Sequence, residues 1–286
     1  MILLADGGST KVDWRLVDGN KEIKQISTKG ANPFFRTRED ISEEIKAVIK
    51  PAVEEYPIDA IFFFGAGCAS PEKNMIIRNA IADNIKTPYI EVDSDLLAAA
   101  KGLCGTNKGI TCILGTGSNS CFYDGVTIKE NISPLGYILG DEGSGAVLGR
   151  LFIGACLKNQ LTSGLKEKFL KEFDLTPAII LDTVYKQPMA NRFLASLSPF
   201  LIENIQDKTV YNLVYNAFKD FFVKNVMQYD YKNNDVHFTG SVAYHYQDIL
   251  RKVGTEMKIR TGTIAQSPME GLIRYYAREC QTIYNR

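Results

Sequence analysis

Residues 2–19 read ILLADGGSTKVDWRLVDG and decide the fold, because a later stretch repeats their design. They contain a short apolar run, a glycine-rich polar turn at 6–9, a second apolar run and an Asp-Gly turn. Residues 110–125, ITCILGTGSNSCFYDG, have the same order, with their glycine-rich turn at 115–119. Chance rarely reproduces turn chemistry and strand order together, so we expect two domains of one topology.

The first domain, residues 1–108, continues with alternating helix and strand patterns. The expected elements are strands at 2–5, 12–17, 22–28, 60–64 and 88–92, and helices at about 38–55, from 71 and from 94 to 102. The continuous apolar run at 60–64 is typical of a strand covered on both faces. Three consecutive strands followed by helices that alternate with strands indicate a mixed-sheet α/β domain.

The second domain, residues 109–286, carries a long helical insertion at about 143–227. Within the insertion, residues 210–222 place apolar side chains on one face of a helix. The elements expected after it are a strand at 236–239, a turn at Gly240-Ser241 and a last helix at 269–283. A chain of 286 residues is long enough for two domains with full cores.

The composition excludes several classes of protein. The chain has 33 Lys and Arg against 33 Asp and Glu, so it lacks the net positive field of most nucleic-acid and anionic-membrane binders. Six cysteines without a CxxC pair, and two histidines, favour reduced buried thiols over a zinc site or a disulfide framework. No apolar stretch approaches a membrane span, and the start, MILLADGG, lacks the basic region of a secretory signal. We therefore expect a soluble cytoplasmic protein.

The two glycine-rich turns are candidates for phosphate binding. Glycine between strands is often only turn geometry, because glycine tolerates a positive φ. However, a turn that serves only as a turn has no reason to recur in both domains. We expect the backbone N–H groups and hydroxyls of 7–10 and 115–119 to bind the phosphates of one nucleotide from both sides of an interdomain cleft. Lys11 follows the first turn and either adds positive charge or is a solvated strand residue. The spacing fits neither a Walker A loop nor a GxGxxG turn.

Three aspartates follow predicted strands. Asp6 ends the first strand beside the first turn, and we expect it to hold Mg²⁺ through a water molecule, since phosphate sites commonly use one or two carboxylates. Asp93 is interpreted first as a helix cap. Asp95 falls in the first turn of that helix, where the helix dipole favours a charged carboxylate that could act as a base in phosphoryl transfer. The alternative for Asp95 is an ordinary acid at a helix N-terminus.

Residues 140–145, GDEGSG, form the third notable string. Asp141 and Glu142, flanked by glycines before a helix, are either a plain cap or hydrogen-bond acceptors for sugar hydroxyls. The backbone freedom of the glycines, with Gly136 upstream, suits the close approach that a sugar needs.

Together these strings resemble the actin-like ATPase and sugar-kinase superfamily, and more closely the BadF/BadG/BcrA/BcrD-type ATPases with their N-acetylglucosamine kinase members. DGGSTK at 6–11 and LGTGSN at 114–119 are similar to the two phosphate motifs, GDEGS at 140–144 to a sugar-site string, and FTGSV at 238–242 to the nucleoside-binding turn. The resemblance runs through the whole chain in order. It implies two ribonuclease-H-like domains around a cleft, and transfer of the γ-phosphoryl group of MgATP to a sugar hydroxyl.

The resemblance also implies roles for particular residues. Asp95 matches the general base. The expected ATP and phosphate contacts are Gly7, Gly8, Ser9, Thr10, Lys11, Gly115, Thr116, Gly117, Ser118, Gly240 and Ser241. The expected substrate contacts are Asn32, Asp95, Asn119, Gly136, Asp141 and Glu142, and Asp6 is the expected Mg²⁺ residue. The family's animal N-acetylglucosamine kinases carry a tryptophan near GDEGS where this chain has Leu135.

Three functions remain open on the sequence. The first is a kinase that converts an amino sugar, N-acetylglucosamine above all, to its 6-phosphate with ATP and Mg²⁺. The second is an ATPase that activates a 2-hydroxyacyl-CoA dehydratase through an iron–sulfur cluster. The third is a non-catalytic, nucleotide-gated sugar sensor or actin-like assembly protein. The expected partners are a sugar and a nucleotide rather than nucleic acid or membrane, and a homodimer stays open.

Overall fold

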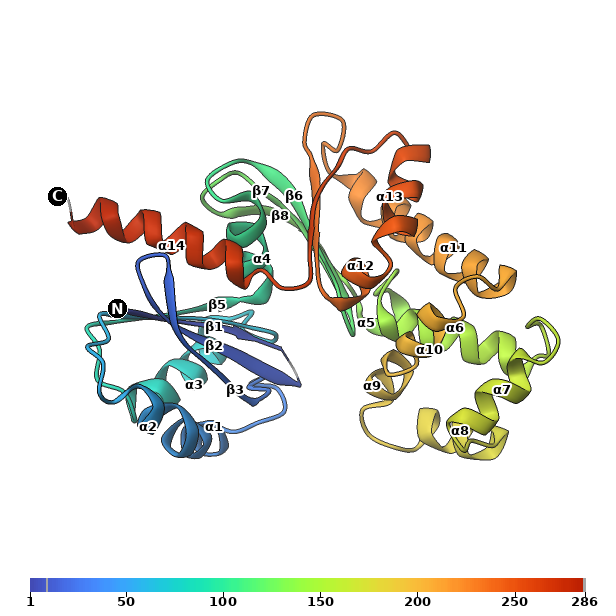
Figure 1. The fold of residues 1–286 in the computed structure, drawn as a ribbon, viewed down its shortest axis with the longest axis horizontal. Coiled ribbons are helices and arrows are strands. Elements are labelled where there is room, and N and C mark those ends of the chain that lie inside the picture. The colour runs from blue at the N-terminus through green and yellow to red at the C-terminus, as the bar shows by residue number, and fades with distance from the viewer. Residues whose placement is uncertain (9, 285–286) are drawn as a thin grey trace. The chain divides into compact units, whose positions relative to one another are not determined.

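The computed structural model describes the backbone of residues 1–8 and 10–284 and the side chains up to residue 278 (Figure 1). Contacts divide the chain into two compact units. The first unit comprises Met1–Asn107, Gly125–Thr127 and the chain from Pro268 onward, and the second comprises Lys108–Asp124 and Ile128–Ser267. No helix in the described part of the chain is both long and apolar enough to cross a membrane.

The first unit is built on a five-stranded sheet with the order β3-β2-β1-β4-β5. The strands are β1 (Ile2–Gly7), β2 (Lys11–Asp18), β3 (Lys21–Lys29), β4 (Ala60–Gly65) and β5 (Tyr89–Ser94). β1, β2 and β3 pair antiparallel, whereas β1, β4 and β5 pair parallel. This is the predicted mixed sheet.

Helices cover both faces of the first sheet, which explains the continuous apolar runs of β1 and β4 (Figure 1). The helical segments are α1 (Arg38–Glu44), η1 (Ile45–Ile49), α2 (Lys50–Val53), α3 (Pro71–Ala82), α4 (Asp95–Cys104) and α14 (Met269–Tyr284). In β1, Leu3 packs in the cluster under α1 to α3, whereas Leu4 packs in the cluster under α4 and α14. The strand therefore has no solvent face.

The helix predicted at 38–55 contains a π-helical turn, η1, between α1 and α2. Pro51 follows that turn directly. Because proline has no N–H and its ring clashes with the carbonyl four residues earlier, the chain widens locally to i→i+5 bonding, and Lys50 N–H donates to the Ile45 carbonyl.

The last helix, α14, belongs by its contacts to the first unit, although the sequence assigned all of 109–286 to the second domain. Its N-terminal end crosses α4 at a pair of glycines: a Cβ placed on Gly271 would lie 1.8 Å from the carbonyl oxygen of Gly102. Leu272 and Tyr276 of α14 are buried against the first sheet. A contact between backbones so distant in sequence leaves no local signal, so the sequence could not reveal it.

The second unit repeats the first sheet, with the order β10-β9-β6-β7-β8. Its strands are β6 (Gly109–Leu114), β7 (Ser118–Tyr123), β8 (Ile128–Ile132), β9 (Val236–Thr239) and β10 (Thr261–Ala265). Here too the first three strands in sequence pair antiparallel, and β6, β9 and β10 pair parallel. The prediction of an α/β fold with two domains of one topology is confirmed.

Ten helical segments belong to the described part of the second unit. They are α5 (Gly136–Leu139), α6 (Gly145–Leu157), α7 (Leu165–Glu172), α8 (Pro177–Tyr185), α9 (Ala190–Ala195), α10 (Ser198–Glu203), α11 (Lys208–Lys224), η2 (Val226–Gln228), α12 (Ser241–His245) and α13 (Gln247–Glu256). The amphipathic helix predicted at 210–222 is α11, whose buried face includes Val214, Phe218 and Phe222. The five cysteines with described side chains are buried, as expected for reduced thiols, and the side chain of Cys280 lies outside the described residues.

We predict that Gly271→Ala destabilises the protein by about 1–3 kcal/mol, because the new methyl group would overlap the Gly102 carbonyl. Gly154→Ala in α6 is the matched control, since a Cβ there meets nothing within 4 Å and alanine favours a helix by up to about 1 kcal/mol. Thermal unfolding followed by circular dichroism should show a lower Tm for the first variant and an equal or higher Tm for the second. Equal Tm values for Gly271→Ala and the native chain would contradict the close helix crossing.

Candidate active site

Three parallel strands of the first unit end at the same level. Gly7 of β1 pairs with Gly65 of β4, and Gly65 pairs with Ser94 of β5. One level earlier in the same ladder lie Asp6 and Asp93. Ligands of α/β sheets bind outside the carboxyl ends of the strands, and here those ends carry carboxylates and glycines.

The first glycine turn leaves the sheet at a point where a side chain would not fit. A Cβ on Gly7 would lie 2.9 Å from the ring of Phe63, and the N–H of Gly8 donates to the carbonyl of Lys11 (2.8 Å). Gly7 is buried and Gly8 is exposed. The turn therefore passes from the core to the surface within two residues.

The remaining predicted residues of this turn lie on the surface or outside the described chain. Thr10 and Lys11 are exposed, and Ser9 lies outside the described residues. Asp6 is half-buried. No group of three or more His, Cys, Asp or Glu in the described chain could hold a metal. A single carboxylate beside phosphate oxygens nevertheless suits Mg²⁺, which keeps most of its water ligands.

The loop after β3 places Asn32 against the turn that follows β4. Asn32 is only 8% exposed, and its Oδ1 accepts a hydrogen bond from the N–H of Phe34 (2.9 Å). Gly67 has a φ of +84°, and a Cβ there would lie 2.4 Å from Oδ1 of Asn32. Only glycine at position 67 allows this packing.

Phe34 is a candidate site residue that the sequence analysis missed. Its side chain is 61% exposed although it is a large aromatic, and Lys73 Nζ lies 4.4 Å from the ring centroid. Lys73 also donates to the carbonyl of Pro33 (3.0 Å), which holds the loop against α3. An exposed aromatic ring two residues after Asn32 suits the apolar face of a sugar, and the string GANPFF contained this signal.

Asp95 occupies the first turn of α4, as predicted, but Asp93 is not the helix cap. The cap is Ser94, whose Oγ accepts from the N–H of Leu97 (3.2 Å), while Asp93 is the second-last residue of β5 and its side chain accepts from the N–H of Ser94 (2.6 Å). Serine caps as well as aspartate does, so the sequence did not decide between the two neighbours.

The pKa of Asp95 also differs from the expectation, because a helix N-terminus that favoured the charged carboxylate would lower this pKa, whereas it is raised. Burial raises the pKa of Asp95 to about 6, although the backbone N–H groups of Leu96 and of Asp95 itself oppose the shift. Desolvation therefore outweighs the helix terminus. A carboxylate with a pKa just below neutrality is still largely ionised at pH 7 and is well matched to general-base catalysis.

Cys68 lies near Asp95 and Asp93 and beside the glycine that packs on Asn32. Burial, then the charges of Asp95 and Asp93, raise the pKa of its thiol to about 12. Cys68 follows Gly67, which packs on Asn32, so the asparagine and the two aspartates lie near one short turn. The thiol stays protonated and packs as an apolar group, not as a nucleophile.

In the second unit, the glycine turn is held on the N-terminus of α6. Gly145 N–H donates to the carbonyl of Gly115 (2.8 Å), and Ala146 N–H donates to that of Thr116 (3.1 Å). Gly117 faces Asp141, because a Cβ there would lie 3.0 Å from Oδ2 of that aspartate. The predicted phosphate turn and the GDEGS string thus lie side by side.

Asp141 is a second carboxylate with a raised pKa. Burial raises its pKa to about 6 and the charge of Glu142 adds to the shift, while the N–H of Ser118, which donates to Oδ1 (3.3 Å), opposes it. Asp141 also has a φ of +53°, a strained conformation for an aspartate.

The FTGS turn lies beside the same loop. Gly240 has a φ of +109°, and a Cβ there would lie 2.3 Å from the carbonyl oxygen of Leu114. Its N–H donates to the carbonyl of Ala265 (3.2 Å), and Ser241 opens α12. The ends of β6, β9 and β10 therefore meet at one edge, as in the first unit.

Three predicted substrate contacts have structural roles within their own unit. Glu142 forms an ion pair with Lys224 (3.3 Å) and accepts from the amide of Asn225 (3.3 Å). Asn119 Oδ1 accepts from the N–H of Ser120 and from the amide of Asn131, both at 2.9 Å. Gly136 has a φ of +75° and opens α5, so its conformation alone calls for glycine.

Comparison with known proteins agrees with this geometry. The model of the BadF/BadG/BcrA/BcrD ATPase family matches residues 5–273. The chain belongs to this ATPase family. A curated relative, the N-acetyl-D-glucosamine kinase of Dictyostelium discoideum, is 24% identical over 222 residues, which are 70% of each chain.

Solved structures of related fold extend the comparison. The crystal structure of a proposed N-acetylglucosamine kinase from Porphyromonas gingivalis is 48% identical, with a TM-score of 0.95 over 98% of this chain and 100% of that one. A ROK family glucokinase from Streptomyces griseus, solved with glucose and AMPPNP, is 16% identical with a TM-score of 0.62 over 97% and 99% of the chains. At 16% identity, the glucokinase supports similarity of fold only. Membership in the BadF/BadG/BcrA/BcrD family of ATPases implies that the chain uses ATP.

We predict that Asp95→Asn stabilises this family member at neutral pH. The folded-state pKa of Asp95 is raised to about 6 from 3.8, so ionisation costs stability as the pH rises from about 4 to about 6, and the cost persists above that. Asparagine should therefore increase the free energy of unfolding by about 1–3 kcal/mol at pH 7.5. Urea unfolding at pH 4.0 and pH 7.5 measures the gain, which should shrink at the lower pH; a gain that is equal at both values contradicts the raised pKa.

Proposed function

We propose that the protein is an ATP-dependent sugar kinase whose acceptor is an N-acetylated amino sugar, with N-acetylglucosamine converted to its 6-phosphate. The observation that carries the proposal lies in the first unit: Asp95, whose pKa burial raises to about 6, and Asn32 are both near the turn at Gly67 and Cys68. The ATPase family and the two relatives named as N-acetylglucosamine kinases support the choice of ATP as donor and of an amino sugar as acceptor.

In this proposal the first unit supplies the general base and several of the contacts to the acceptor sugar. Asn32 supplies polar contacts to the sugar, and the exposed ring of Phe34 packs on its apolar face. Asp95 accepts the proton of the hydroxyl that reacts. Because its pKa lies near neutrality, it is ionised before the reaction and basic enough to take the proton during it.

The glycine turns supply the phosphate contacts. Backbone N–H groups in turns of this kind bind phosphate oxygens without a side chain in the way. The residues proposed for ATP and its phosphates are those of the two turns and the FTGS string: Gly7, Gly8, Ser9, Thr10, Lys11, Gly115, Thr116, Gly117, Ser118, Gly240 and Ser241. Asp6 would hold Mg²⁺ through water, and the ion would supply charge neutralisation at the β- and γ-phosphates.

The proposed reaction is an in-line displacement at the γ-phosphorus. The acceptor oxygen forms a bond to the γ-phosphorus while the bond from that phosphorus to the β–γ bridging oxygen breaks. The hydroxyl proton passes to the carboxylate of Asp95, and ADP leaves with the bridging oxygen. Catalysis then rests on positioning and charge stabilisation, as is general for phosphoryl transfer.

The alternatives draw less support from the described residues. A dehydratase activator needs cysteines that can reach a shared iron–sulfur cluster, but Cys112 and Cys121 are fully buried and pair in the sheet with Ser120 and Thr111, so they face opposite sides. A non-catalytic sensor would have no use for a carboxylate held at a pKa that costs stability.

The test of the proposed function is a coupled ADP-release assay with ATP and Mg²⁺ across N-acetylglucosamine, glucosamine, N-acetylmuramic acid, N-acetylmannosamine and glucose. We expect the highest kcat/KM for N-acetylglucosamine, with a sugar 6-phosphate as product. ADP release that no sugar accelerates would contradict a sugar kinase.

We predict that Asp95→Asn lowers kcat at least about 100-fold and leaves nucleotide affinity within about threefold, since a general base contributes roughly 10²–10⁴ to the rate. In the native protein, kcat/KM should fall as the pH drops below about 6, where Asp95 becomes protonated. In Asp95→Asn, kcat/KM should not show this fall at low pH. Near-normal sugar phosphorylation by Asp95→Asn would rule out the assigned base.

We further predict that Asp141→Asn raises the KM for the sugar about 10-fold or more, as expected for loss of a charged hydrogen-bond acceptor. Glu142→Gln is the matched control in the same string, because its carboxylate already pairs with Lys224 and Asn225. Steady-state kinetics should separate the two. A larger KM change for Glu142→Gln would reverse their proposed roles.

A further inference from the structure

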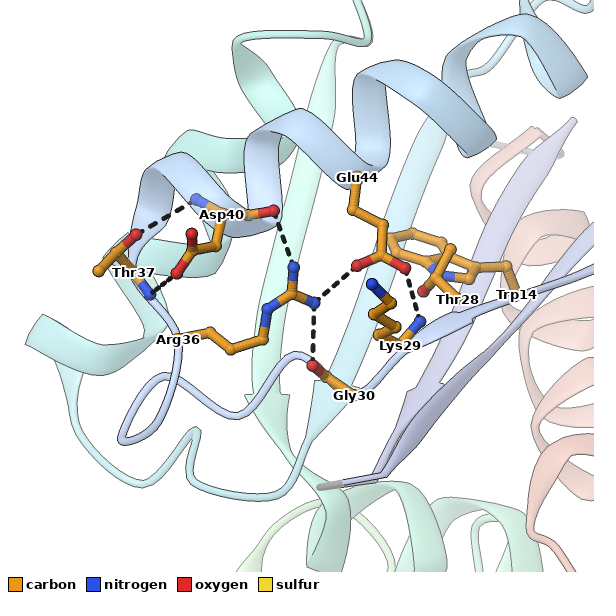
Figure 2. A network of polar contacts seen from close by, with 8 residues as sticks. All are labelled: Trp14, Thr28, Lys29, Gly30, Arg36, Thr37, Asp40 and Glu44. Atoms are coloured by element: carbon orange, nitrogen blue, oxygen red, sulfur yellow. Dashed lines mark hydrogen bonds and ion pairs between the residues drawn. The ribbon is translucent and has the colours of Figure 1, made fainter.

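The loop that carries Asn32 and Phe34 is held by one arginine, Arg36, at its C-terminal end (Figure 2). The guanidinium donates to the carbonyl of Gly30 (3.1 Å) and to Glu44 Oε2 (2.8 Å) through Nη1, and to the carbonyl of Asp40 (2.8 Å) through Nη2. Arg36 thus ties the start of the loop, its end and helix α1 together.

Glu44 completes the network from the side of the helix. Its Oε1 accepts from the N–H of Lys29 (2.7 Å), the residue before Gly30, and its Oε2 accepts from Arg36. The two side chains are only 23% and 16% exposed, so their charge-assisted bonds are shielded from much of the solvent. Thr37 and Asp40 close the N-terminus of α1 with a capping box, which fixes the helix that presents Glu44.

Gly30 connects this network to the first phosphate turn. Its carbonyl accepts from Arg36, and its N–H donates to the carbonyl of Thr10 (2.9 Å). Thr10 belongs to the turn in which the N–H of Gly8 donates to Lys11. One residue of the acceptor loop, Gly30, is therefore bonded through its carbonyl to Arg36 and through its N–H to the turn proposed to bind the nucleotide.

We propose that Arg36 and Glu44 are positioning residues that couple acceptor binding to nucleotide binding; this rests on the proposed function. A sugar bound at Asn32 and Phe34 orders the loop between Gly30 and Arg36. Because Gly30 is hydrogen-bonded to Thr10, ordering the loop also orders the turn at Thr10. Less conformational entropy of this turn is then lost when the nucleotide binds. By linkage, the nucleotide strengthens sugar binding by the same factor.

The test compares the affinity of AMPPNP with and without saturating N-acetylglucosamine, by titration calorimetry on the full chain with Mg²⁺. In the native protein we expect the sugar to tighten AMPPNP binding about fivefold or more, within the usual range for coupled sites. In Arg36→Met the factor should fall to about one. Amide hydrogen exchange should show that sugar protects Thr10 and Gly30 in the native protein but not in the variant.

Arg38→Met is the matched control. Arg38 lies two residues further on and also forms a bidentate ion pair, with Asp83, but it touches neither Gly30 nor Glu44 among the contacts of the described chain. Its coupling factor should equal that of the native protein. Arg36→Lys, which keeps the charge, should restore part of the coupling.

Glu44→Gln tests the network without removing the arginine, in case Arg36→Met does not fold. Its amide oxygen can still accept from the N–H of Lys29, so we expect a folded protein with a reduced coupling factor. The proposal is overturned if folded Arg36 and Glu44 variants keep the native factor, or if Arg38→Met loses it equally. A native protein that phosphorylates sugars with a coupling factor of one overturns the coupling alone, whereas one that phosphorylates no sugar overturns the proposed function and the coupling with it.

Discussion

The register of three parallel strands is the constraint on which the rest of this structure depends. Backbone hydrogen bonds between β1, β4 and β5 bring Gly7, Gly65 and Ser94 to one level, so turns distant in sequence emerge at one edge. A shift by one residue would turn every side chain to the other face of the sheet. The second unit uses the same arrangement of β6, β9 and β10, which places its glycine turn beside Gly240.

Around these strand ends, glycines set how closely the backbone can approach. Gly67 leaves room for the amide of Asn32, Gly117 for the carboxylate of Asp141, and Gly240 for the carbonyl of Leu114. In each case a single methyl group would overlap a polar atom that the site needs. The glycines thus act through the space that they leave free, in addition to any contact of their own N–H groups with phosphate.

The electrostatics of the site follow from burial more than from charge pairing. Asp95 and Asp141 each have a pKa of about 6 because each is withdrawn from water, and backbone N–H groups compensate only in part. Arg36 and Glu44, by contrast, satisfy each other and the adjacent backbone. The two carboxylates proposed to meet the ligand are therefore compensated only in part, whereas the charges of Arg36 and Glu44 are paired.

The sequence by itself determined the two-domain α/β fold and the strings that lie at the strand ends, because turns, caps and apolar periodicity are local properties of the chain. It placed Asp95 in the first turn of its helix. It favoured Asp93 as the cap because serine and aspartate cap equally well, and it did not predict the raised pKa of Asp95 because the burial of that residue is not visible locally. Only the tertiary structure assigned α14 to the first unit and joined Arg36 to Gly30 and Glu44. The first feature is a contact between segments far apart in sequence, which depends on how the whole sheet brings them together. The second joins residues across a loop, and the local pattern of the chain does not specify the path of that loop.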